Sequence, residues 1–375
     1  SALRRVKTAF RARAVPLLSV FAAFSFLIMM FNLPLPGGTT GHAVGMANAT
    51  IVLGPAMSIL AVSIALLVQA LFFGDGGITA FGANCFNMAI VGSLTAFCVY
   101  RLLAWKAGTA SVRRILAAGF AGYAAINLAA LCAAVEFGIQ PALFHDASGA
   151  PLYAPYPLSI SIPAMMLGHL TFAGLAEFVV SAGVVAYLQR ASPEMLQSDG
   201  PHGWPALSLW PAIALLAALT PFGILAAGTA WGEWKIENFP RQVPSGLAHW
   251  SSVWKAPHAD YAPGFIHNPW LAYLFSAGLG VALIGVSVFL LKRLLAPPSR
   301  RWSFVEQTIQ RLIRAIQDAF FAEDTARQSG LLQRLDARVK LAGFGALLVS
   351  AVACRSLRPL LALFLLAIVL ALLSN

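Results

Sequence analysis

Long apolar segments recur along this 375-residue chain and dominate its pattern of hydrophobic and polar positions. A helix needs about 20 apolar residues to cross the roughly 30 Å hydrocarbon core of a bilayer, and most of these segments approach that length. A membrane β-barrel would instead show alternating segments of about ten residues. The pattern therefore predicts an all-α, polytopic integral membrane protein, with spans near 15–33, 55–73, 84–104, 115–136, 162–189, 209–230 and 269–291.

Basic residues gather in four clusters, at 4–13, 101–114, 190 and 292–340. The positive-inside rule places all four on the cytoplasmic side, so an even number of crossings must separate the first two. Only three clear spans do so. We therefore predict that the Gly-rich segment 38–53 crosses or deeply enters the membrane as a short embedded helix, packed against its neighbours. The segments 34–41, 74–83 and 231–268 then lie outside.

The character of the chain changes after Pro297-Pro298, which we take as the boundary between two units. Between positions 304 and 321 apolar residues recur on one helix face, with charges opposite. This pattern predicts an amphipathic helix over 303–329 that lies on the cytoplasmic membrane surface.

Composition agrees with the spans. Hydrophobic residues make up 59% of the chain and charged residues 10%, with a mean hydropathy of +0.77. A soluble domain of this length would need far more charge. The net charge of +11 does not indicate a nucleic-acid partner, because the basic residues flank apolar spans. The expected surroundings are a lipid bilayer, and the expected location is a bacterial inner (cell) membrane, crossed several times.

His42 is the first candidate for chemistry, and it lies in the sequence GGTTGHAVG. Glycines allow the backbone to approach an ion closely, and imidazole is a common ligand of divalent transition metals. A histidine that is hydrogen-bonded between packed helices would show the same local pattern. The residues alone leave both interpretations open.

His169 and Glu177 form the second candidate, because they lie eight residues apart on a similar face of one predicted span. A carboxylate inside a span is costly and needs a partner, which either His169 or the backbone would supply. An acid–base pair of this kind supports an alternative function, a membrane-embedded enzyme. An enzyme would require both groups to open onto one cavity.

The remaining polar candidates favour structural roles. Asp75 adjoins the turn-forming glycines of FFGDGG. Asn84 and Asn87 lie one turn apart, and we expect them to bond to the backbone. Three histidines recur at intervals of nine in the outer loop, and loop histidines seldom bind metal: His249, His258 and His267. The sequence has no GxxxxGK[ST] motif, so an ATP-driven mechanism would need partner subunits.

The segment 31–92 contains, in order, PxPGGTTGH, LGP, LLVQALFFGDGG and GANxFNM. With these motifs the chain resembles the CbiM/NikM family, the substrate-binding components of energy-coupling-factor transporters for cobalt and nickel. The later segment GHLTFAGLAEFVVSAGVVAYLQR is similar to another helix of that family. The part from 231 resembles the CbiN/PDGLE accessory module, and LLQRLDARVKLAGF resembles the start of a CbiQ coupling component. The expected units are 1–230, 231–297 and 298–375.

The resemblance implies an importer component whose transported substrate is Ni²⁺ or Co²⁺, with no permanently bound cofactor and with His42 as a metal ligand. The implied site includes, as possible supporting residues, Asp75, Asn84, Asn87, His169 and Glu177. Implied partners are the CbiQ-like component, partly fused, and cytosolic ATPase subunits. Family members also use an N-terminal Met-His, whereas this chain starts at Ser1. We therefore expect a piece of a longer protein that binds metal weakly by itself; the choice between nickel and cobalt stays open.

Overall fold

The computed structural model describes residues 14–35, 39–196, 206–226, 228–233, 243–251 and 253–295, with single positions at 339 and 343. The chain divides into two units, and almost all described residues belong to the first, Ser1–Pro263 with Asn268–Leu295. The predicted amphipathic helix at 303–329 and the CbiQ-like segment lie outside the described residues. The fold below is that of the first unit.

Within the described residues, five helices are long and apolar enough to cross a membrane: Pro55–Phe73, Phe81–Leu103, Val112–Leu143, Leu158–Ala191 and Pro269–Leu294. These confirm five of the predicted spans as helices, with ends that differ by a few residues. The other two predicted spans form shorter apolar helices, α2 (Ala14–Met29) and α10 (Ala206–Leu219), the latter continued by the 3-10 helix η5 (Thr220–Leu225). The protein is therefore a helical, multi-pass membrane protein.

Three of the long helices contain a stretch of π-helix. The first span joins α4 (Pro55–Val68) to η1 (Gln69–Phe73), and the second joins α5 (Phe81–Asn84), η2 (Cys85–Gly92) and α6 (Ser93–Leu103). The fourth joins α8 (Leu158–Gly168), η3 (His169–Ala173) and α9 (Gly174–Ala191). A π-helix bonds residue i to i+5, which widens the turn and is frequent at functional sites.

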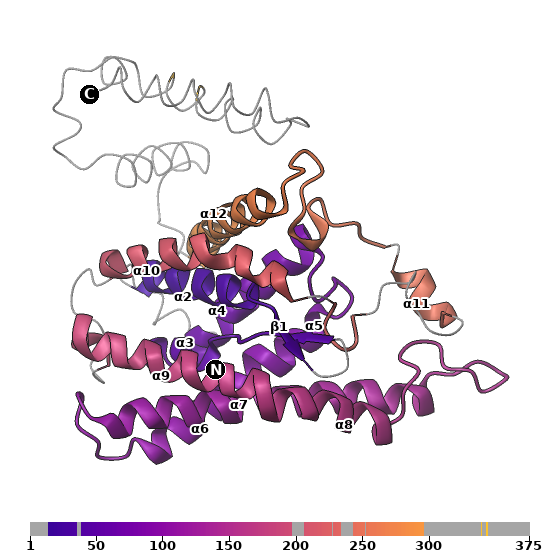
Figure 1. The fold of residues 1–375 in the computed structure, drawn as a ribbon, viewed down its shortest axis with the longest axis horizontal. Helices are drawn as coiled ribbons and strands as arrows, with labels where there is room; N and C mark the ends of the chain where they lie inside the picture. The colour runs from indigo at the N-terminus through magenta and orange to yellow at the C-terminus, as the bar shows by residue number, and fades with distance from the viewer. Residues whose placement is uncertain are drawn as a thin grey trace, which may run out of the picture. The chain divides into compact units, whose positions relative to one another are not determined.

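Helix α7 (Val112–Leu143) packs against α6, α8 and α9, which lie beside it in Figure 1. Alanine and glycine dominate its buried face, so the helix axes approach closely. At Gly122, for example, a Cβ atom would lie 2.3 Å from the Ser181 hydroxyl of α9. Large apolar side chains of α7 and α9 are exposed on the outside of the bundle, as expected for a surface that faces lipid, among them Phe120, Leu128 and Val179. On the other side of the unit, α2 packs against α4, α10 and α12 (Pro269–Leu295).

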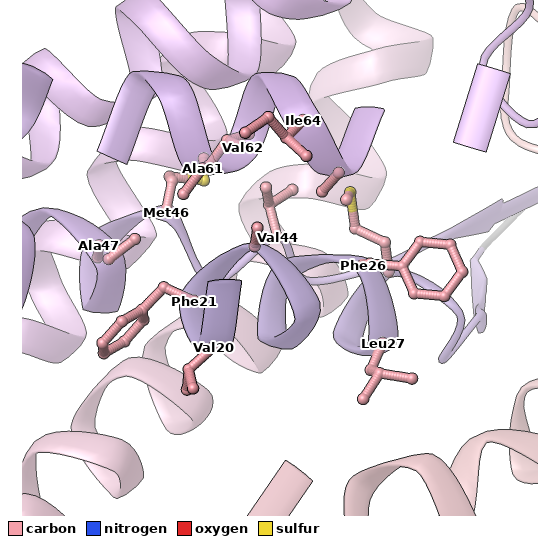
Figure 2. Packing of buried hydrophobic residues seen from close by; sticks show 14 of the residues in the cluster. Val20, Phe21, Phe26, Leu27, Val44, Met46, Ala47, Ala61, Val62 and Ile64 are labelled. Carbon is pink, nitrogen blue, oxygen red and sulfur yellow. The ribbon is translucent and has the colours of Figure 1, made fainter. Parts of the chain in front are cut away.

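The Gly-rich segment 38–53 is only partly the helix that we predicted. Residues Met46–Leu53 form α3, whose first five residues are buried, whereas Thr39–Gly41 is the short strand β2, paired antiparallel with β1 (Leu33–Leu35). A helix could not begin earlier, because Gly45 has φ +75° and the chain before it is extended or coil. The predicted burial against neighbours is confirmed: Figure 2 shows Val44, Met46 and Ala47 in one apolar cluster with residues of α2 and α4.

Hydrogen bonds gather the predicted inner segments at one end of the helices. Arg114 donates to the carbonyl of Leu196 at 2.7 Å, and Gln189 donates to the carbonyl of Ser111 at 3.0 Å. The predicted outer segments meet elsewhere, where the amide of His258 donates to the carbonyl of Phe72 at 2.9 Å. These contacts agree with placing the second and third basic clusters on one side, as the parity argument predicts.

Candidate functional site

A small cavity of about 130 Å³, lined by both apolar and polar side chains, lies beside the β1–β2 hairpin. Its walls come from β2 and the coil that follows it, η2, α7, the junction of α8 with η3, and the segment 230–233. The volume holds several water molecules. The cavity therefore brings together five segments of the chain, and its polar side chains include Asn84, Asn87, Glu233 and two histidines.

The two histidines are His42 and His169, so the structure brings together residues from two separate candidate motifs. Nδ1 of His169 lies 2.8 Å from the carbonyl oxygen of Met165, and Nδ1 of His42 lies 3.2 Å from that of Ala43. A carbonyl only accepts, so Nδ1 carries the proton in each bond and the neutral ring keeps its lone pair on Nε2. Metal-binding histidines are commonly fixed in this way.

Glu177 lies directly behind the coil that carries His42, but it does not line the cavity. Its side chain is 0% exposed, and its carboxylate accepts the backbone N–H groups of Val44 at 2.7 Å and Gly45 at 3.0 Å. The backbone is therefore the partner that this carboxylate needs. Because His169 opens onto the cavity and Glu177 does not, the two do not form the acid–base pair that an enzyme would require.

Asp75 also lies away from the cavity wall. It accepts a hydrogen bond from Gln69 at 3.1 Å and another from the hydroxyl of Tyr261, and Gln69 donates to the same hydroxyl at 3.0 Å. Burial, together with the charge of Asp75, raises the pKa of Tyr261 well above its usual range, so the phenol remains a donor. This network ties η1 to the 3-10 helix η7 (Ala259–Tyr261), which is a structural role.

Asn84 and Asn87 both line the cavity, but their bonds differ from each other. Asn84 donates to the carbonyl of Gly76 at 3.2 Å, which agrees with the predicted backbone bond. The prediction is wrong for Asn87, whose amide nitrogen donates to the Glu136 carboxylate at 2.7 Å. The π-helix that begins at Cys85 widens the turn between the two and directs Asn87 to α7. The Oδ1 atom of Asn87 is buried and has no hydrogen-bond partner among the described residues.

Glu233 is a cavity residue that the sequence did not single out. The backbone N–H of Gly76 donates to its carboxylate. Burial, then the charges of Asp75 and Asp260, raise the pKa of Glu233 to about 8. Residue Glu233 is nevertheless exposed overall, whereas His42 and His169 are half-buried. The residues around Glu233 read WGEW, which is typical of an aromatic belt at the membrane interface. Nothing in this sequence connects Glu233 to the Gly-rich motif.

The outer-loop histidines stay outside this cavity. The ring of His258 packs beside that of Phe73, with the ring centroids 6.5 Å apart, and burial lowers its pKa. The ring of His249 packs edge-on against Trp250 at 5.3 Å, and His267 belongs to the second unit. Over the described ranges, no three His, Cys, Asp or Glu residues approach closely enough to form a ready-made metal site. The cavity therefore presents nitrogen and oxygen donors without a complete set of three.

Buried polar groups at one end of a multi-pass helical bundle, opening onto a small cavity, define a membrane transport protein better than an enzyme. The comparisons with known proteins agree. Residues 1–195, more than half of the chain, match the family CbiM, described as "Cobalt uptake substrate-specific transmembrane region". The chain belongs to this family, and it is a transporter component, not an enzyme.

Two relatives extend over about three quarters of the chain. The "Fused nickel transport protein NikMN" of Rhodobacter capsulatus is 53% identical over 305 residues, which cover 75% of this chain and 87% of the relative. The "Probable fused nickel transport protein LarMN" of Lactiplantibacillus plantarum is 42% identical over 292 residues, covering 74% and 83%. A crystal structure of a truncated transition metal transporter is 47% identical and covers 50% of this chain and 86% of its own, with a TM-score of 0.46.

Proposed function

We propose that this chain is the substrate-binding membrane component of an ATP-driven importer of the energy-coupling-factor type, and that it carries Ni²⁺ or Co²⁺. The family description names cobalt uptake, and the two fused relatives are named for nickel transport. The transported ion occupies the cavity between β2, η2 and η3, with His42 as a ligand.

The observation that carries this proposal is the pair of imidazoles that line one cavity, His42 and His169. Both rings have Nδ1 bonded to a backbone carbonyl, which leaves Nε2 as the metal-binding atom. Imidazole nitrogen suits Ni²⁺ and Co²⁺, and a given nitrogen site binds Ni²⁺ more tightly in the Irving–Williams order. We therefore expect nickel to bind more tightly than cobalt in this cavity.

Energy comes from partners in this proposal. Because the sequence carries no Walker-type phosphate-binding motif, ATP is hydrolysed by cytosolic subunits. A CbiQ-like component connects those subunits to the membrane. The segment from 301 onward resembles the first part of such a component. This chain then binds the ion from the outer side of the membrane and passes it on for transport into the cell.

Nickel binding by histidine variants tests the site. We expect His42→Ala to weaken Ni²⁺ binding by about a hundredfold and His169→Ala by about tenfold, because each removes one nitrogen donor. Calorimetry on the purified full-length protein measures the affinities, and nickel uptake by the complete transporter measures the consequence.

His145→Ala is the matched control, since that histidine is exposed in the loop between α7 and α8, away from the cavity. It should bind Ni²⁺ as the unaltered protein does. Unchanged affinity in both His42→Ala and His169→Ala would show that the ion binds elsewhere.

A further inference from the structure

A short segment beyond the residues that match the CbiM family, residues 229–233, covers one side of the cavity; we refer to it as the cover segment. The carbonyl of Thr229 accepts the backbone N–H of Thr40 at 3.1 Å and the hydroxyl of Thr39 at 2.8 Å. Ala230 then forms a parallel bridge with Thr40. The cover segment therefore extends the β1–β2 hairpin from about 190 positions further along the chain.

The rest of the cover segment is held by aromatic packing. The ring of Trp231 lies edge-on to that of Phe137 at 5.7 Å and beside that of Tyr156 at 6.0 Å. Gly232 has φ +103°, and a Cβ atom there would lie 2.6 Å from the Phe137 ring. Only glycine allows the backbone to turn so close to this ring. The segment is consequently fixed in place immediately before Glu233.

Glu233 gives the cover segment its chemistry. Among the described residues that line the cavity, it supplies the carboxylate, and the N–H of Gly76 orients it. It is exposed, whereas the rings of His42 and His169 are half-buried. An ion that arrives from outside therefore meets carboxylate oxygen before imidazole nitrogen.

A second group points to a hydrated ion. Asn87 is 3% exposed and lines the same cavity, and its Oδ1 atom has no hydrogen-bond partner in the described part of the chain. Its amide nitrogen is already used by Glu136, so the orientation of the amide is set and Oδ1 is left as an acceptor. A buried acceptor of this kind needs a donor, and a water molecule of a hydration shell supplies one.

We propose that Glu233 is the capture ligand of the transporter: it binds the hydrated divalent cation at the outer side of the cavity, with a metal-bound water donating to Asn87. The cation then sheds water and passes to the imidazoles. Carboxylate and amide oxygens suit hydrated cations, and imidazole suits the partly dehydrated Ni²⁺ or Co²⁺. This inference rests on the proposed function, and it assigns a cation ligand to the part of the chain that resembles the CbiN/PDGLE module.

The first test is nickel uptake by the complete transporter at about pH 8.5, where Glu233 is mostly ionised because its pKa is about 8. A carboxylate at the outer side raises the local cation concentration and the association rate, so Glu233→Gln should raise the KM for uptake about tenfold while the maximal rate changes less than about twofold. Glu233→Asp, which keeps the charge, should recover most of the loss. Asp146→Asn removes the same charge from another exposed outer loop and should leave KM unchanged.

The second test separates capture from the imidazole site without transport. Mn²⁺ prefers oxygen ligands, so its binding, followed by electron paramagnetic resonance, reports on Glu233. We expect His42→Ala to keep Mn²⁺ binding and Glu233→Gln to lose it. An unchanged KM and unchanged Mn²⁺ binding in Glu233→Gln would overturn the capture role, whereas unchanged Ni²⁺ binding in His42→Ala and His169→Ala would overturn the proposed function instead.

Discussion

The two walls of the cavity are built in opposite ways. On the inner wall, the coil that carries His42 is attached through Val44 and Gly45 to a fully buried carboxylate, Glu177. On the outer wall, the cover segment is attached by backbone bonds to the edge of a two-stranded hairpin. A buried hydrogen bond to a charged group contributes more to stability than one between neutral groups, such as those that Thr39 and Thr40 donate to Thr229. We infer that the wall that carries His42 is held more strongly than the wall formed by the cover segment.

The largest effect should follow from loss of the inner attachment. Glu177→Leu leaves the N–H groups of Val44 and Gly45 without an acceptor, and each such buried group costs about 1–3 kcal/mol. We expect the melting temperature to fall and Ni²⁺ binding to be lost, because the coil no longer holds His42. Thermal unfolding in detergent and calorimetry measure these effects.

Glu177→Gln should be milder than Glu177→Leu, because an amide oxygen still accepts a hydrogen bond. Ser181→Ala is the control, since its hydroxyl lies 3.5 Å from the same carboxylate and contributes only a weak bond. If all three variants bind nickel normally, the inner wall is not held through Glu177.

A smaller effect should follow from weakening the cover segment. Thr39→Val removes the hydroxyl that donates to Thr229, a bond worth about 1 kcal/mol, so local opening should become about fivefold more frequent. Hydrogen exchange should quicken at residues 228–233 and stay slow at 42–45. Thr171→Val, which loses a bond to Leu167 within the helix, serves as control. Equal acceleration at 42–45 would mean that the two walls open together.

The smallest effect concerns pH. The pKa of Glu233 in the folded protein is about 8, above its ordinary value of 4.5, so the folded state binds a proton there that the unfolded state releases. Stability from this group is present below about pH 4.5 and is lost as the pH rises through about 8. In cation-free buffer the melting temperature should therefore decline as the pH rises toward about 8 and level off above it. Glu233→Gln should flatten this decline; an identical decline in the variant would assign it to other groups.

The spans were predictable because each helix must be apolar over its own length, which is a local property. The burial of residues 46–50 was predictable for a different reason, since the basic clusters fixed the number of crossings. The strand at 39–41 was not, because its bonds come from residues 33–35 and from Thr229, both outside the segment. The start of the helix after Gly45 could not be predicted either, because it depends on the left-handed backbone of that glycine, which the sequence does not show.

The site was predictable in its parts but not in its grouping. His42 and His169 each stood out in their motifs, and the cavity that unites them arises from packing between η3 and the hairpin. Glu233 gave no signal, because its importance comes from a contact across about 190 positions. Glu177 was recognised as an unusual buried charge, although its partner proved to be the backbone.

The π-helices impose a constraint on how this chain can change in length. A single π turn corresponds to one extra residue in an otherwise α-helical span. Deletion of one residue from η3 would convert the π turn to an α turn and remove the widened turn on which His169 lies. Single-residue deletions in the α7–α8 loop, where most side chains are exposed, should preserve nickel binding. A deletion in η3 should weaken it. The length of each span is in this sense as much a part of the site as the side chains that it carries.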